Sequence, residues 1–126
     1  MRGTSELTRV LVVDDRTEMA EMVADDLCDR GYEGIAVTSG KDALRRLRDE
    51  RIDALVTDVR MPEIDGLTLL RASRHLDPSR PVIMMTAYGT LDTAIEASGE
   101  GAYHFLVKPF RLEELVQVLR RALETH

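Results

Sequence analysis

Short apolar runs alternate with amphipathic stretches along this chain, and the alternation repeats five times. The apolar runs occupy residues 9 to 14, 34 to 38, 53 to 58, 81 to 86 and 104 to 107. Repeated strand and helix units of this kind build a parallel sheet, and its strands are apolar on consecutive positions because helices cover both faces. The pattern therefore predicts an α/β fold with a five-stranded, parallel, doubly wound sheet. The run at 34 to 38 is the weakest, which places it at an edge of the sheet.

The helices between the strands are predicted from apolar residues spaced three and four positions apart. Ser39 and Asp42 form a capping box before the second helix, and Asp65 with Gly66 opens the third. The core-facing stripe of the first helix is predicted to be Met19, Met22, Val23 and Leu27. The fourth helix, near residues 91 to 98, has few large apolar side chains, so we expect low local stability there.

Length and charge narrow the function classes. With 126 residues, the chain is expected to form a single domain that needs no disulfide, and Cys28 is its one cysteine. The apolar runs are too short to cross a membrane, and the first residues lack the apolar core of a signal peptide, so we expect a cytoplasmic protein. The net charge of −6 argues against direct binding of a nucleic-acid backbone.

Polar side chains close four of the apolar runs. They are Asp14, Asp15, Asp58, Thr86 and Lys108. The carboxyl ends of the strands in an open parallel sheet gather along one edge, where ligands bind. Three carboxylates, one hydroxyl and one ammonium group suit a hard divalent cation held by oxygen, with a phosphoryl group beside it.

Each of these residues also has an ordinary structural interpretation when it is taken alone. Asp14 and Asp15 can cap a helix, Asp58 can form a turn, and Lys108 can be a surface cation. Their shared position at strand ends and their complementary chemistry favour a common site instead. Crowded carboxylates raise one another's pKa values unless a cation lies between them, and Mg²⁺ meets that need.

Four sequence motifs carry a resemblance to a known family. They are Val12-Val13-Asp14-Asp15, the segment from Thr57 to Gly66, Met85-Thr86-Ala87, and Val107-Lys108-Pro109-Phe110. In this order and spacing the chain resembles the receiver domain of bacterial two-component response regulators. The resemblance covers residues 7 to 124, so we expect residues 1 to 126 to form one receiver domain. It implies a flavodoxin-like (βα)5 fold with strand order 2-1-3-4-5, which brings the first and third strands together.

The resemblance also implies the chemical roles of these residues. Asp58 is the expected phosphoacceptor, and Asp15 is expected to bind Mg²⁺ together with Asp58 and the backbone carbonyl of Arg60. Asp14 would contribute through a water molecule. Lys108 is expected to pair with Asp58 or with its phosphoryl group. Such a domain is not an enzyme in the usual sense, although it catalyses its own phosphorylation and dephosphorylation.

Further roles implied by the resemblance concern the switch. Thr86 is the expected switch hydroxyl, the bond between Lys108 and Pro109 is expected to be cis, and the signal is expected to leave through the fourth helix, the fifth strand and the fifth helix. The second switch residue, often tyrosine in this family, is Phe105 here. The expected partners are a sensor histidine kinase or a phosphotransfer protein, a small phosphodonor, and a second copy in a homodimer.

A looser resemblance points to receivers of the nitrogen-regulator type, which precede an ATPase module in enhancer-binding transcription regulators. It rests on residues 86 to 90 and 101 to 103. The chain would then be a stand-alone receiver or part of a longer regulator with a C-terminal output domain. Two alternatives remain: a Mg²⁺-dependent aspartyl-phosphate phosphatase, and a degenerate receiver that serves only for dimerisation. The phosphatase class normally has a second aspartate two residues after the nucleophile, where this chain has Arg60.

Overall fold

The computed structural model describes residues 7–87 and 91–125, in which five strands alternate with five helices. The strands are β1 (Arg9–Val13), β2 (Glu33–Val37), β3 (Ala54–Asp58), β4 (Val82–Thr86) and β5 (His104–Val107). The helices are α1 (Thr17–Asp29), α2 (Gly40–Asp49), α3 (Gly66–Leu76), α4 (Leu91–Gly99) and α5 (Leu112–Thr125). This alternation confirms the predicted fold class.

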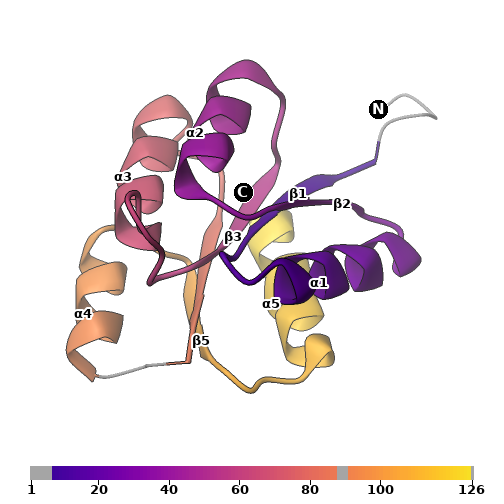
Figure 1. The fold of residues 1–126 in the computed structure, drawn as a ribbon. Helices are drawn as coiled ribbons and strands as arrows, with labels where there is room; N and C mark the ends of the chain where they lie inside the picture. Colours follow the sequence, from indigo (N-terminus) through magenta and orange to yellow (C-terminus); the bar gives the residue numbers. More distant parts are fainter. Residues whose placement is uncertain (1–6, 88–90, 126) are drawn as a thin grey trace.

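All neighbouring strands in the sheet are parallel, and their order is β2-β1-β3-β4-β5. Helices α1 and α5 cover one face of the sheet, and α2, α3 and α4 cover the other (Figure 1). β2 lies at one edge, as predicted, and four of its five residues are only partly buried. The order places β1 beside β3, so the acidic residues that follow these two strands meet at one edge of the sheet.

The two faces of β1 show how the core is divided. Val10 and Val12 belong to the cluster beneath α1 and α5, whereas Leu11 and Val13 belong to the cluster beneath α2 and α3. All four side chains are fully buried. Successive residues of a strand point to opposite faces, so a strand between two helical layers must be apolar throughout. Burial of each such side chain stabilises the fold by about 1.5–3 kcal/mol.

The predicted core-facing stripe of α1 is wrong at one position. Met22 is 54% exposed, and the buried residues of the helix are Ala20, Val23, Ala24 and Leu27. The two alanines let α1 approach the sheet closely: a Cβ on Gly34 of β2 would lie 2.3 Å from the carbonyl oxygen of Ala24. Close backbone approach thus selects small residues for this face, and the larger methionine is turned outward.

Both predicted helix starts are confirmed. The backbone N–H of Asp42 donates to Ser39 Oγ at 3.1 Å, and the N–H of Thr68 donates to Asp65 Oδ1 at 2.9 Å. Each bond satisfies one of the backbone donors left free at a helix start and contributes about 1 kcal/mol. A helix also forms at the position predicted for the fourth one. No helix in the described part of the chain is long and apolar enough to span a bilayer.

Candidate functional site

Three carboxylates converge at the carboxyl ends of β1 and β3. Asp14 and Asp15 lie just beyond β1, and Asp58 is the last residue of β3. One oxygen atom from each carboxylate lies within 4.8 Å of the others. Asp14 is fully buried, Asp58 is 8% exposed, and Asp15 is exposed to solvent. The strand order therefore brings together residues that are more than 40 positions apart in the chain.

The interpretation of the acidic pair as a helix cap is wrong. The N-cap of α1 is Arg16, whose side chain makes no capping bond. Asp14 instead accepts a hydrogen bond from the Arg16 N–H, at 2.9 Å from Oδ1, and this bond fixes the turn after β1. Asp15 is left on the outer side of that turn, where its carboxylate is open to solvent.

The backbone around Asp58 is held by a close approach of α3. The Arg60 N–H donates to Asp58 Oδ1 at 3.4 Å, and the Gly66 N–H donates to the Val59 carbonyl at 2.8 Å. A Cβ on Gly66 would lie 2.1 Å from the Asp58 carbonyl oxygen. Only glycine therefore allows α3 to begin here without displacing the strand that carries Asp58.

Lys108 is the cation of the site. Its Nζ lies 2.6 Å from Asp14 Oδ2 and 3.2 Å from Asp58 Oδ2, so it bridges two carboxylates and is closer to Asp14 than to Asp58. The Lys108 N–H donates to the carbonyl of Thr86 at 2.7 Å, which joins the end of β5 to the end of β4. The peptide bond between Lys108 and Pro109 is cis.

Burial of the carboxyl group is the largest influence on the pKa of Asp58, and it raises that pKa above its ordinary value. The neighbouring Asp14 carboxylate raises it further, while Lys108 and the Arg60 N–H lower it. The sequence predicted that the crowded carboxylates raise one another's pKa values. The structure assigns desolvation the larger part, because Asp58 lies inside the sheet edge while Asp15 lies outside.

A cavity of about 240 Å³ opens over Asp58. Its lining consists of Asp15, Arg16, Asp58, Arg60, Ala87 and Lys108. The sequence analysis did not identify Arg16 or Ala87 as site residues, although each directly follows a residue that it did identify. The sequence signals were the position of Arg16 directly after the motif that ends at Asp15 and the position of Ala87 as the last residue of the motif Met85-Thr86-Ala87.

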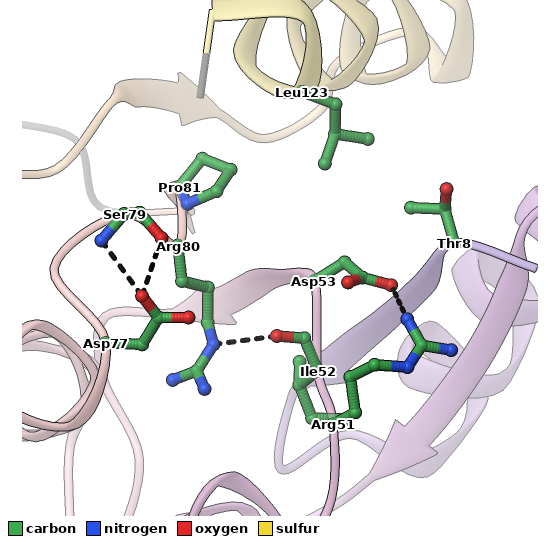
Figure 2. Close-up of a pocket in the computed structure, with 9 residues that line it drawn as sticks. All are labelled: Thr8, Arg51, Ile52, Asp53, Asp77, Ser79, Arg80, Pro81 and Leu123. Carbon is green, nitrogen blue, oxygen red and sulfur yellow. Dashed lines mark hydrogen bonds and ion pairs between the residues drawn. The ribbon is translucent and has the colours of Figure 1, made fainter. Parts of the chain in front are cut away.

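A larger cavity, of about 400 Å³, lies at the opposite end of the sheet (Figure 2). Figure 2 shows that its polar side chains bond to neighbouring protein groups: Arg80 Nε donates to the Ile52 carbonyl at 2.9 Å, and Arg51 pairs with Asp53. The Ser79 hydroxyl donates to Asp77 and lowers the pKa of that carboxyl group. These contacts join the loops that precede β3 and β4, so we interpret this region as structural.

The two expected switch residues lie on β4 and β5. Thr86 is 1% exposed at the end of β4. Phe105 is half-buried and packs against the core cluster that includes Met84 and Ala97. Residues 88 to 90, which carry part of the looser resemblance, lie outside the described residues.

The donor set fits a hard divalent cation. Carboxylate oxygens are the ligands that such cations prefer, and the three here are close enough for one ion to contact several of them. Asp14 and Asp58 are buried and lie on the inner side of the site, while exposed Asp15 leaves room for water ligands of the ion. Lys108 compensates only part of the negative charge of the three carboxylates, so a divalent cation would complete the neutralisation.

Comparisons with known proteins agree with this geometry. The chain is 37% identical over 118 residues to the regulatory protein AtoC of Escherichia coli, a match that covers 94% of this chain and 26% of AtoC. The chain thus spans about a quarter of the length of such relatives. A receiver domain protein from Methanospirillum hungatei superposes with a TM-score of 0.91 at 26% identity, covering 95% of this chain and 96% of that one.

The receiver domain of NtrX from Brucella abortus superposes with a TM-score of 0.86 at 35% identity, covering 93% of this chain and 99% of that one. A family model described as the response regulator receiver domain matches residues 10–120. These residues include all three clustered carboxylates and Lys108. The chain therefore belongs to the family of response regulator receiver domains.

Proposed function

We propose that this receiver domain accepts a phosphoryl group on Asp58 in a Mg²⁺-dependent reaction. The observation that carries the proposal is the position of the Asp58 carboxylate: it lies 3.2 Å from Lys108 Nζ and within the cluster that suits a divalent cation. A carboxylate nucleophile beside an ammonium group and a cation site has the charge complement that phosphoryl transfer requires.

In the proposed reaction, a carboxylate oxygen of Asp58 attacks the phosphorus atom of a phosphodonor. The bond from phosphorus to the leaving group breaks, and the leaving group departs with its electron pair, so that an acyl phosphate remains on Asp58. Lys108 is within reach of the new phosphoryl oxygens. Asp14, Asp15, Asp58 and the Arg60 carbonyl would hold Mg²⁺, which would supply neutralisation of the incoming phosphoryl charge.

The phosphoryl group would be reported through α4, β5 and α5. A new phosphoryl group brings negative charge and strong acceptors to the end of β3, next to β4, and these acceptors would draw the Thr86 hydroxyl inward. The half-buried Phe105 ring would then turn into the space that Thr86 leaves. Phe105 has no hydroxyl group to anchor it, so we expect the switch to depend mainly on Thr86.

The partners follow from this role. The phosphodonor would be a sensor histidine kinase, a phosphotransfer protein or a small phosphorylated molecule in the cytoplasm. A second copy of the domain, or an output domain in a longer chain, would read the changed surface. The similarity of this chain to ZraR of Escherichia coli, which is named a transcriptional regulatory protein, supports an output in transcription.

Intact mass spectrometry tests the proposed reaction. The parent chain, incubated with Mg²⁺ and acetyl phosphate, should gain one phosphoryl group that alkali removes, and Asp58→Asn should gain none. Equal labelling of the two proteins with an alkali-labile group would refute the assignment. Rapid release of phosphate from many phosphate esters, with no stable adduct, would favour the phosphatase instead.

Hydrogen exchange tests the switch. Beryllium fluoride, which imitates the phosphoryl group, should change amide exchange between residues 91 and 108 in the parent chain. Thr86→Ala should still be phosphorylated on Asp58. Its change in exchange between residues 91 and 108 should be smaller, because the hydroxyl that couples Asp58 to this segment is missing. Changes confined to other parts of the parent chain would contradict this route.

A further inference from the structure

We propose that two copies of this chain associate through the outer face of α1 in one copy and the outer face of α2 in the other. Met22 of α1 would lie in a hollow on α2, and carboxylates of α1 on either side of it would pair with cations of α2. This surface is separate from α4, β5 and α5, and the association does not depend on the proposed phosphorylation of Asp58.

Helix α1 has an acidic outer face that the fold does not use. The helix contains five carboxylates and no cation, and four of the five are exposed. None of their side chains forms a hydrogen bond or an ion pair with any residue that the structure describes. The five residues are Glu18, Glu21, Asp25, Asp26 and Asp29.

This arrangement of charges disfavours the helix. Asp25 lies four residues from both Glu21 and Asp29, and like charges at this spacing repel one another. Asp26 and Asp29 also lie near the carboxyl end of the helix, where the helix dipole favours cations. Residues that break local rules without a structural gain are often functional. A positively charged partner surface would remove this repulsion.

Helix α2 presents the opposite charge. Lys41, Arg45 and Arg48 are exposed, and their spacing of four and three residues places them on one face. Arg45 pairs with Asp42 at 2.6 Å, whereas the side chains of Lys41 and Arg48 have no partner in the described part of the chain. Because α1 and α2 cover opposite faces of the sheet (Figure 1), these charges meet only when a second copy is present.

The two faces also match in spacing and in shape. Glu18 and Asp25 are seven residues apart, as are Lys41 and Arg48, which is about 10 Å along either helix. Met22 lies between the two carboxylates and is 54% exposed. A flexible methionine side chain adapts to an irregular hollow. The hollow on α2 has a volume of about 340 Å³ and is lined by Ser39, Lys41, Asp42, Arg45 and Arg48.

Sedimentation equilibrium of the unphosphorylated chain tests the association. Exposed ion pairs contribute little each and are screened by salt, so we expect weak association and a monomer at the micromolar concentrations of unfolding experiments. At about 300 µM protein and about 25 mM NaCl, the mean mass should exceed that of one chain. Raising NaCl to about 500 mM should weaken the association by about tenfold.

Charge reversal tests which faces meet. One variant combines Glu18→Lys with Asp25→Lys, and the other combines Lys41→Glu with Arg48→Glu. Association of either variant alone should be at least about tenfold weaker, because like charges then face one another. An equimolar mixture should associate again, because each altered face meets the opposite charge. Both variants keep a net negative charge, −2 and −10, so net charge cannot draw them together.

Two further variants separate this contact from changes in charge or folding. Glu96→Lys with Glu124→Lys also gives a net charge of −2, at exposed positions of α4 and α5, and should alter the association by less than about twofold. Met22→Ala leaves the charge unchanged and should weaken the association by about fivefold. The melting temperature of dilute Met22→Ala should not fall, because Met22 is exposed in the single chain.

Three results would each overturn the inference. A parent chain that stays monomeric at low salt would leave the acidic face of α1 to a basic partner other than this chain. A mixture of the two reversed variants that stays monomeric would show that α1 and α2 do not meet. A control at Glu96 and Glu124 that weakens association as much as the α1 reversal would place the contact on α4 and α5. None of these results affects the phosphorylation of Asp58, which intact mass measures separately.

Discussion

At the amino end of the sheet, three carboxylates form ion pairs with three arginines, whereas at the carboxyl end two buried carboxylates share a single lysine. The matched pairs are Glu33 with Arg9, Glu50 with Arg9 and Arg46, and Asp53 with Arg51. At the other end, Lys108 contacts both Asp14 and Asp58, and Asp15 stands beside them. The same sheet thus has one end where carboxylates and arginines are equal in number in the ion pairs, and one end where the buried carboxylates outnumber the lysine that they contact.

This difference separates structural from functional charge. Matched pairs satisfy one another and need no ligand, so their removal should affect stability alone. Excess buried carboxylates destabilise the fold until a cation or a new bond offsets them. The carboxyl end should therefore respond to metal and to phosphorylation, and the amino end to neither.

The largest effect is expected from Arg80→Met at the amino end. Arg80 is 8% exposed and donates to the Ile52 carbonyl and to Ser73 Oγ, both at 2.9 Å. Its loss leaves two buried acceptors unsatisfied and should lower the free energy of unfolding by about 3 kcal/mol. Urea unfolding measures this loss, with Arg48→Gln as the exposed control. A change in the Mg²⁺ affinity of the folded variant would contradict the claim that the amino end of the sheet has no influence on metal binding at the carboxyl end.

An intermediate effect is expected from Lys108→Met. This change removes the cation that Asp14 and Asp58 share and should lower the stability of the metal-free protein by about 2 kcal/mol. Mg²⁺ should recover part of the loss, because it neutralises the same carboxylates. Thermal unfolding with and without Mg²⁺ measures both changes. A variant as stable as the parent without metal would show that the carboxylates do not depend on Lys108.

The smallest effect, and the one with reversed sign, is expected from Asp58→Asn. In the metal-free protein at neutral pH this change should raise stability by about 1 kcal/mol, because it removes a buried charge whose pKa is raised. With saturating Mg²⁺ the variant should be the less stable protein, since it has lost a metal ligand. Asp15→Ala should show the same reversal. If the variant without metal is less stable than the parent, the claim that the buried carboxylates destabilise the metal-free fold is wrong.

The pH dependence of this difference follows from the direction of the pKa shift. The folded-state pKa of Asp58 lies above its ordinary value of 3.8, so the folded protein binds the proton more tightly than the unfolded chain does. The stability that this carboxyl group contributes is present below that ordinary value and is lost as pH rises through the folded pKa. The advantage of Asp58→Asn should therefore be small near about pH 3 and grow as the pH rises through the folded-state pKa of Asp58.

The sequence predicted the carboxyl end better than the amino end for a physical reason. Hydrophobic periodicity predicts the strands, and the family resemblance implies their order. The positions of Asp14, Asp58 and Lys108 at the strand ends then predict one site, and the structure brings these residues together. The bond that ties Arg80 to Ile52 depends on how two loops fold over one another. No local pattern encodes such a contact.

The other differences have separate local causes. Met22 has the spacing of a core residue, but alanines form the buried face because α1 lies so near to β2. Arg16 was overlooked because helix-capping rules direct attention to acidic and hydroxyl residues, and it breaks those rules. Lys108 contacts Asp14 more closely than Asp58, and the Asp14 carboxylate is held by the Arg16 N–H in the turn after β1.

The most direct test is to locate the new bond itself. Borohydride reduces an acyl phosphate on aspartate to homoserine, and peptide mass spectrometry then identifies the modified residue. After reaction with acetyl phosphate and Mg²⁺, homoserine should appear at Asp58 alone, and it should be absent when Mg²⁺ is removed by a chelator. Homoserine at Asp14 or Asp15, or equal formation without a divalent cation, would contradict the assignment of this site.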